Sequence, residues 1–149
     1  MQLIGTSRTK KFQESLIEKI KENEKIQLIN QVPHKQIWEY LNNAHIGIIP
    51  FYDKTIFQYN TPTKLFEYMI SDCAIIASEL QPIKEFCNES ISWAKPGDVD
   101  SLVKAINYYF DNHNQYVNHK KNNHAIIQSE YNWGHAAQKL LNIYNEMLN

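Results

Sequence analysis

The sequence predicts an α/β fold, in which helices cover both faces of a parallel sheet. Short apolar runs alternate with longer amphipathic segments five times along the 149 residues, and right-handed crossovers turn such an alternation into a parallel sheet. The runs 46–49 and 74–77 are apolar at every position, which is typical of strands buried on both faces. With 43% hydrophobic residues, a chain of this length is expected to form one domain.

Strands are predicted where a short apolar run ends at turn-forming residues. These runs are Gln2–Ile4, Ile26–Ile29, Ile46–Ile49, Ala74–Ala77 and Ile91–Trp93. Helices are predicted between and after them, where apolar residues recur at helical spacing or a capping residue begins a long polar segment. They are expected at about Lys10–Glu22, His34–Asn43, Pro62–Met69, Pro82–Phe86, Asp98–Phe110, Asn112–Glu130 and Asn132–Leu148.

Four of these helices have an apolar side that is expected to follow the helical period. The residues expected to point inward are Phe12, Leu16, Ile17 and Ile20, then Ile37, Trp38 and Leu41, then Leu102, Val103, Ile106 and Phe110. The last helix has the most regular stripe, made of Trp133, Ala136, Ala137, Leu140, Leu141, Tyr144 and Leu148. Asp98 and Asn132 are the predicted N-caps of the helices that follow them.

A loop of ten residues, Pro50–Tyr59, leads into the helix on which the rest of the interpretation depends. A connection of this length in an α/β fold is typical of a functional segment. Thr61 is predicted to cap the helix with its hydroxyl, and Pro62 to occupy the first helical position. The N–H groups of Thr63 and Lys64 then point out along the helix axis, at the positive end of its dipole. Together with the Lys64 ammonium, they form a predicted anion site.

Glu67 follows Thr63 by four residues and Lys64 by three, so it lies one helical turn from this anion site, at about 5 Å. Phosphates require N–H donors and ribose hydroxyls require a bidentate acceptor, so the pair suits a nucleotide. Leu65, Phe66 and Met69 face the other way, into the core. The alternative is an ordinary capped helix with an exposed lysine and glutamate.

Composition excludes several other classes of function. The 15 basic and 16 acidic residues leave a net charge of -1, which gives no basic field for nucleic acid. The apolar runs are too short to span a membrane and the N-terminus has no signal pattern, so a soluble, cytoplasmic protein is expected. Cys73 and Cys87 lie among apolar residues and are expected to be buried thiols. The glycines form no phosphate-binding loop, and the histidines have no metal-ligand spacing. A carboxylate pair of Asp53 and Glu67 remains as a hydrolase alternative.

Five segments together resemble glycosyltransferase family 4, the retaining GT-B sugar transferases. The run P-T-K-L-F-E-Y-M-I-S-D-C-A-I-I-A-S at 62–78 is similar to that family's P-x-K-L-x-E-Y-M-A-x-G-x-P-V-I-A-S segment. The other four segments agree in order and spacing; they are Leu3-Ile4-Gly5, Ala44–Pro50, Ala94–Asp98 and Tyr131-Asn132-Trp133. Five segments in register are much more specific than any one of them.

The resemblance implies a Rossmann-like domain that forms the carboxy-terminal half of a GT-B enzyme and holds a nucleotide-diphosphate sugar. The enzyme would transfer a hexosyl group to a glycan or lipid-linked acceptor, in polysaccharide or cell-surface glycan biosynthesis, without a metal or a bound cofactor. Glu67 matches the acid that binds the ribose and is the candidate catalytic residue; Lys64 and the turn Thr61–Thr63 match the diphosphate end. The remaining residues implied in the site are Asn60, Tyr59 and, where the backbone meets the base, Val32.

This chain departs from the family pattern at three places. Tyr59 stands where the family has a glutamate that touches the donor sugar, and Asp72 and Ala74 replace a glycine and a proline. The domain's first strand, with its phosphate-binding Arg and Lys, and the whole acceptor domain are expected to lie before Met1. Residues 1–149 are therefore expected to be inactive alone. The acceptor-binding half would come from a removed domain or from a partner chain. The full enzyme is expected to be at most peripheral to the inner face of the membrane. The alternatives are one subunit of a split glycosyltransferase or a non-catalytic binding module.

Overall fold

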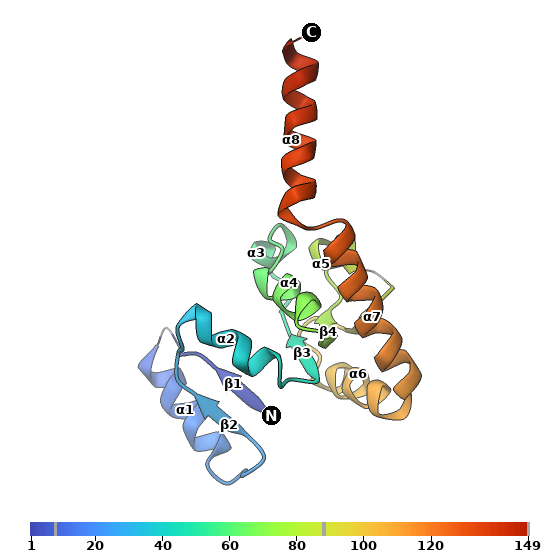
Figure 1. Ribbon diagram of the computed structural model, residues 1–149. Coiled ribbons are helices and arrows are strands. Elements are labelled where there is room, and N and C mark those ends of the chain that lie inside the picture. The colour runs from blue at the N-terminus through green and yellow to red at the C-terminus, as the bar shows by residue number, and fades with distance from the viewer. Residues whose placement is uncertain (8, 88, 149) are drawn as a thin grey trace. The chain divides into compact units, whose positions relative to one another are not determined.

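The computed structural model describes residues 1–7, 9–87 and 89–148 and divides into two compact units, Met1–Tyr40 and Leu41–Asn149 (Figure 1). The α/β prediction is confirmed, and every strand pair is parallel. The described strands form two sheets, β1–β2 and β3–β4–β5, where the sequence predicted one continuous sheet. All five predicted strands exist, and their bounds differ from the prediction by one residue at most.

The first unit is a small α/β unit with a sheet of two short strands. It contains β1 (Gln2–Ile4), α1 (Lys10–Ile20), β2 (Gln27–Ile29) and most of α2 (His34–Leu41). The prediction that α1 buries an apolar side is wrong for Phe12 and Ile17, which are 60% and 47% exposed, while Leu16 and Ile20 are half-buried. A sheet of two three-residue strands offers too little surface to cover the whole apolar side of an eleven-residue helix.

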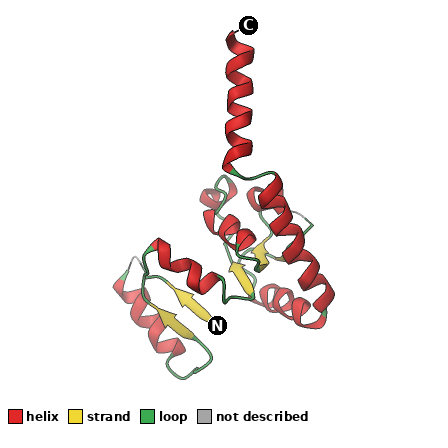
Figure 2. Ribbon diagram, in the orientation of Figure 1, coloured by secondary structure: helices red, strands yellow, loops and turns green. Residues whose placement is uncertain are grey.

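The second unit is organised around β4 (Ala74–Ser78), the central strand between β3 (Ile46–Ile49) and β5 (Ser92–Ala94). Helices and strands of this unit are distinguished by colour in Figure 2. All five residues of β4 are buried. Because successive side chains of a strand point to opposite faces, β4 contributes Ile75 and Ala77 to one core and Ala74 and Ile76 to another. The second unit thus has helices on both faces of its sheet, as predicted.

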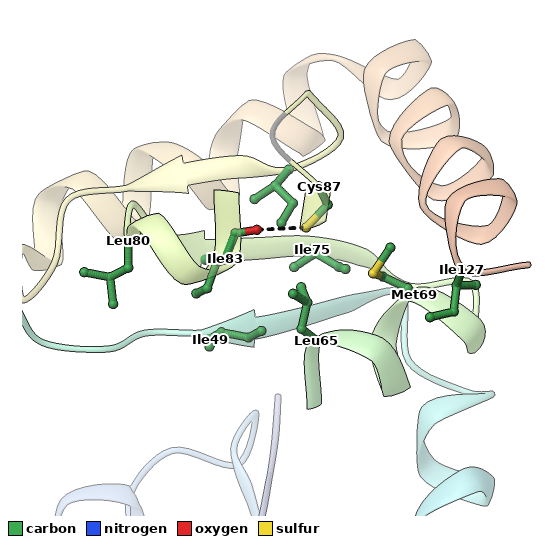
Figure 3. Packing of buried hydrophobic residues seen from close by; sticks show 10 residues of the cluster. Ile49, Leu65, Met69, Ile75, Leu80, Ile83, Cys87 and Ile127 are labelled. Atoms are coloured by element: carbon green, nitrogen blue, oxygen red, sulfur yellow. Dashed lines mark hydrogen bonds between the residues drawn. The ribbon is translucent and has the colours of Figure 1, made fainter. Parts of the chain in front are cut away.

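The larger core lies between β3, β4 and the helices α4 (Thr63–Ile70), α5 (Gln81–Cys87) and α7 (His113–Ser129). Leu65 and Met69 of α4 are fully buried and lie beside Ile75 of the central strand (Figure 3). Phe66 packs against the same core from a partly buried position. The inward side predicted for this helix is therefore confirmed, and it fixes which residues of α4 remain on the outer side.

The smaller core lies under α6 (Val99–Asp111), whose N-cap is Asp98 as predicted: its carboxylate accepts the Ser101 N–H at 2.9 Å. Here the predicted inward residues are partly wrong. Val103 and Phe110 are 48% and 75% exposed, because the helix turns Ala105 and Tyr109 toward the sheet instead. The Tyr109 hydroxyl reaches the backbone of β4 and β5, so a polar contact decides which side of α6 faces inward.

The predicted ten-residue loop Pro50–Tyr59 contains a short helix, α3 (Thr55–Gln58), so the expectation of a loop throughout is wrong in part.

The last helix of the chain is α8 (Trp133–Leu148). Asn132 caps it, because its side-chain oxygen accepts the His135 N–H at 2.9 Å, as the capping prediction requires. α8 has no buried residue, so its apolar stripe is exposed. Over the described part of the chain, no helix combines the length and apolar character that a membrane crossing needs.

Candidate functional site

The carboxyl ends of β3, β4 and β5 meet at one edge of the second unit's sheet, because the strands are parallel. Ligands of open α/β sheets bind outside this edge. The segment from Pro50 to Pro62 leaves β3 here, and it is tied to the next strand by the Ser78 hydroxyl, which donates to the Phe51 carbonyl at 2.7 Å. The beginning of this segment is therefore held at the end of the central strand.

Aromatic contacts order the segment that leads to α4. The rings of Phe51 and Phe57 stack with centroids 4.3 Å apart, and the Gln58 amide donates to the Asp53 carboxylate. Tyr52 lies against the turn after β5, where Gly97 has a φ of +73° and a Cβ would come within 3.0 Å of the Tyr52 ring. A glycine is needed at position 97 for both reasons. The segment is thus packed against two neighbouring strand ends.

Helix α4 begins one residue later than predicted. Pro62 is the N-cap and Thr63 the first helical residue, and the N-cap makes no side-chain hydrogen bond. The predicted capping role of Thr61 is wrong, because its hydroxyl donates to the Pro82 carbonyl at 3.3 Å and so ties the helix start to α5. The Leu65 N–H bonds back to the Pro62 carbonyl at 3.0 Å. The N–H groups of Thr63 and Lys64 are left at the open end of the helix, as all first-turn groups are.

Lys64 and Glu67 lie on the outer part of this helix, as the spacing predicted. Thr63 and Lys64 are exposed and Glu67 is half-buried. The Lys64 Nζ lies 6.0 Å from the centroid of the Phe51 ring, which holds its positive charge beside the loop. Burial is the main cause that raises the pKa of the neighbouring Tyr68, and the Cys73 thiol and the Glu67 carboxylate raise that pKa further.

The other predicted site residues fall into two places. Tyr59 and Asn60 are exposed just before the start of α4, with Tyr59 at 87%. Val32 belongs to the first unit, where it lines a pocket of about 330 Å³ beyond the ends of β1 and β2. Gly5, Gln31 and His34 also line it. The family resemblance indicated Val32 but not His34, although the turn before a helix at a strand end was a usable signal.

A second pocket, of about 320 Å³, lies where α7 ends and α8 begins. We name it the α7–α8 pocket. Three aromatic residues, Phe66, Tyr131 and Trp133, and three polar ones, Glu130, His135 and Lys139, line it. The sequence showed only the helix start Tyr131-Asn132-Trp133 at this place, and no pattern in it indicated a pocket.

The two cysteines are buried thiols. Burial is the main cause that raises the pKa of Cys73 to about 11, and burial raises the pKa of Cys87 to about 12, so neither is a ready nucleophile at neutral pH. Among the residues that the structure describes, His, Cys, Asp and Glu side chains form no group of three that could hold a metal ion.

Three solved structures illustrate what this chain is similar to in fold. Sucrose-phosphate synthase from Thermosynechococcus elongatus matches 99% of this chain at a TM-score of 0.78 and 18% identity. Anabaena HepE, solved in complex with UDP-glucose, matches 97% of this chain at a TM-score of 0.75 and 13% identity. The C-terminal domain of a glycosyl transferase group 1 family protein from Francisella tularensis matches 86% of this chain at a TM-score of 0.72 and 16% identity. The chain spans 38%, 40% and 66% of these proteins, respectively.

These likenesses show that the fold is that of the GT-B glycosyltransferases. A search among curated proteins found no significant sequence match. The family model described as glycosyl transferases group 1, however, matches residues 1–128, which include the first unit and most of the second, from the start of α4 to nearly the end of α7. The chain therefore belongs to the glycosyl transferases group 1 family.

Proposed function

We propose that this chain is the carboxy-terminal, donor-binding part of a retaining family 4 glycosyltransferase. It would hold a nucleotide-diphosphate sugar, from which a hexosyl group passes to a glycan or lipid-linked acceptor. Membership of the group 1 family supports the general activity, and a fold neighbour solved with UDP-glucose supports the class of donor. The polysaccharide pathway and a cytoplasmic location, at most peripheral to the membrane, are part of the same proposal.

The observation that carries the proposal is the start of α4 at the carboxyl edge of the sheet, with Lys64 exposed and Glu67 half-buried one turn along. The diphosphate would accept hydrogen bonds from the N–H groups of Thr63 and Lys64, with Pro62 and Asn60 shaping the turn. The helix end contributes about 1 to 2 kcal/mol to holding an anion. The Lys64 ammonium adds a full charge at the same place, where negative charge develops as the sugar leaves.

Glu67 is assigned to the ribose hydroxyls, because an ionised carboxylate only accepts hydrogen bonds and a ribose diol donates two. Its half-buried position reduces competition from water. Such charge-assisted bonds contribute about 1.5 to 3 kcal/mol. Because these contributions barely offset the entropic cost of association, a nucleoside diphosphate is expected to bind weakly, with a dissociation constant of about 1 mM or higher. The role of Val32 at the nucleobase stays a prediction from the family resemblance.

Further polypeptide is needed for activity under this proposal. The fold neighbours sucrose-phosphate synthase and HepE are much longer than this chain, which spans 38% and 40% of them. We propose that the acceptor-binding half is supplied from outside residues 1–149, by the same gene product or by a partner chain. Residues 1–149 alone are then expected to bind a donor weakly and not to turn over.

Calorimetric titration with UDP, GDP and ADP tests the site. At least one should bind with a millimolar dissociation constant, and Glu67→Gln and Lys64→Ala should each weaken it about tenfold. The matched controls are Glu85→Gln on α5 and Lys104→Ala on α6, which are also solvent-accessible and should change nothing. Micromolar binding that survives Glu67→Gln would show that the site is elsewhere.

A non-catalytic nucleotide-sugar-binding module is the second candidate, and Tyr59 favours it. Its 87% exposed phenol stands where the family has an acid, and it offers no carboxylate to the donor sugar. Assay of sugar transfer with the complete gene product distinguishes the two. Transfer from a radiolabelled donor supports the enzyme, and donor binding without transfer to any acceptor supports the module.

A further inference from the structure

The α7–α8 pocket has a rigid aromatic floor. Phe66 of α4 and Tyr131 form it, with their ring centroids 6.0 Å apart. Phe86 of α5 does not line the pocket but contacts both rings, with its centroid 5.1 Å from that of Phe66 and 5.0 Å from that of Tyr131. Both phenylalanines also pack against the larger core. Because this core fixes their rotamers, the face of the floor stays in place without a ligand.

Trp133, the first residue of α8, also lines the pocket. Its side chain is 87% exposed, although tryptophan is among the residues that gain most from burial. An indole provides a flat apolar face and one N–H donor, so it can cover an apolar surface and hydrogen-bond at the same time. The aromatic residues of the pocket thus differ in their surroundings, because Phe66 packs against the core and Trp133 is open to solvent.

The rim of the pocket has both charge signs. Glu130 supplies acceptor oxygens, Lys139 supplies donors, and the His135 imidazole can do either. In the described ranges 1–7, 9–87 and 89–148, none of these three side chains forms an ion pair with another residue. Opposite charges on one rim favour a neutral ligand over a phosphate. A ligand with many hydroxyl groups would use donors and acceptors together.

We propose that the α7–α8 pocket binds a neutral saccharide, with a pyranose ring between Trp133 and the floor at Tyr131 and its hydroxyls on the polar rim. One face of a pyranose is made of C–H groups and is apolar, while the ring edge bears the hydroxyls, which matches the arrangement of this pocket. The volume of about 320 Å³ lies at the lower end of the range of ligand sites, about 300 to 1,000 Å³. The pocket therefore holds a short segment of a glycan chain.

This inference rests on the proposed function, because a glycosyltransferase that extends a glycan has a saccharide as acceptor and product. The pocket would be a holding site for that chain, distinct from the donor site. The donor site depends on Lys64 and Glu67, and the holding site depends on Trp133 and its rim. The two assignments can thus fail separately.

Indole resonances in ¹H–¹⁵N NMR spectra test the proposal, because the chain has three tryptophans, Trp38, Trp93 and Trp133. Trp133→Phe assigns the third. The probes are maltotriose, cellotriose, mannotriose, galactotriose and chitotriose, each added up to about 10 mM. At least one should shift the Trp133 resonance saturably and leave that of Trp38 in place. If none does so, the proposal is wrong.

Substitutions define the site further. Trp133→Ala should weaken the binding of that trisaccharide about tenfold, followed at the backbone amides of His135 and Lys139. Phe110→Ala is the matched control, because Phe110 is also exposed, at 75%, but lies on α6. Equal loss in both variants, or none in Trp133→Ala, would contradict the proposal. Glu67→Gln should leave saccharide binding unchanged while it weakens UDP binding, so a failure of the donor site is seen independently.

Discussion

The two units of this chain differ most in how much they bury. In the second unit the central strand β4 is buried at all five positions and separates two cores. In the first unit, Met1–Tyr40, none of the described residues is buried, and its two strands have three residues each. Domains of this size rarely stabilise themselves. The second unit therefore carries the stability of the chain, and the start of α4 belongs to that unit.

Truncation of a core residue should give the largest effect and tests this difference directly. Leu65→Ala removes a fully buried side chain and should lower the free energy of unfolding by about 2 to 5 kcal/mol. Leu28→Ala in β2, which is half-buried, should cost less than half as much. Urea unfolding followed at Trp93 of the second unit and Trp38 of the first provides the measurement. Equal losses in the two variants would refute the difference between the units.

Close packing of α4 on β3 predicts the next effect. A Cβ at Gly47 would lie 2.4 Å from the Tyr68 ring, so Gly47→Ala should lower the free energy of unfolding by about 1 to 3 kcal/mol. Tyr68→Leu, which shortens the facing side chain, should remove most of this penalty when the two substitutions are combined. A double-mutant cycle by urea unfolding measures the coupling. Additive effects would mean that the helix moves away at little cost.

Acid should weaken the second unit through His119. Its Nδ1 lies 2.9 Å from the Tyr109 hydroxyl, and burial lowers the pKa of His119 below its ordinary value of 6.5. The folded state thus binds a proton less readily than the unfolded chain. The contribution of neutral His119 to the free energy of unfolding is fully present above its unfolded pKa of about 6.5. This contribution falls as the pH drops below that value toward the folded pKa. His119→Gln should flatten the profile between pH 7 and 5, whereas His135→Gln, on exposed α8, should not.

The turn after α4 should give the smallest effect. Asp72 has a φ of +60°, and its carboxylate lies 3.4 Å from the Lys120 ammonium of α7. Asp72→Gly relieves backbone strain of about 1 kcal/mol and loses an exposed ion pair worth at most about as much. Its thermal midpoint should stay close to that of the native chain. Asp72→Ala loses the pair and keeps the strain, so its midpoint should fall; the reverse order would contradict this account.

The sequence predicted the doubly buried strand and the helix that covers it better than it predicted the inward sides of α1 and α6, for a physical reason. Where a strand is buried on both faces, as at 74–78, the apolar run and the partner helices agree, and the inward side of α4 was predicted correctly. Phe12 of α1 and Phe110 of α6 were wrong, because helical spacing identifies an apolar side but not the area available to cover it.

The candidate site shows the same limit. Spacing along α4 indicated that Lys64 and Glu67 lie on its outer part, since this follows from helix geometry alone. The Thr61 hydroxyl bonds to Pro82, which is distant in sequence, so no local pattern could reveal it. The α7–α8 pocket combines Phe66 with residues beyond position 129. A pocket made by such separated segments leaves no motif in the sequence.

One phenol in this fold should also make unfolding visible by absorbance. The Tyr109 hydroxyl donates to the Ile75 carbonyl, accepts the Ser92 N–H and faces His119, and its burial is the main cause that raises its pKa far above the ordinary value of 10.0. In an alkaline titration followed near 295 nm, Tyr109 is therefore expected to ionise later than exposed tyrosines, as is Tyr68, whose pKa burial also raises. The late part of the tyrosinate absorbance would then report when these buried side chains lose their packing, without any added dye or label.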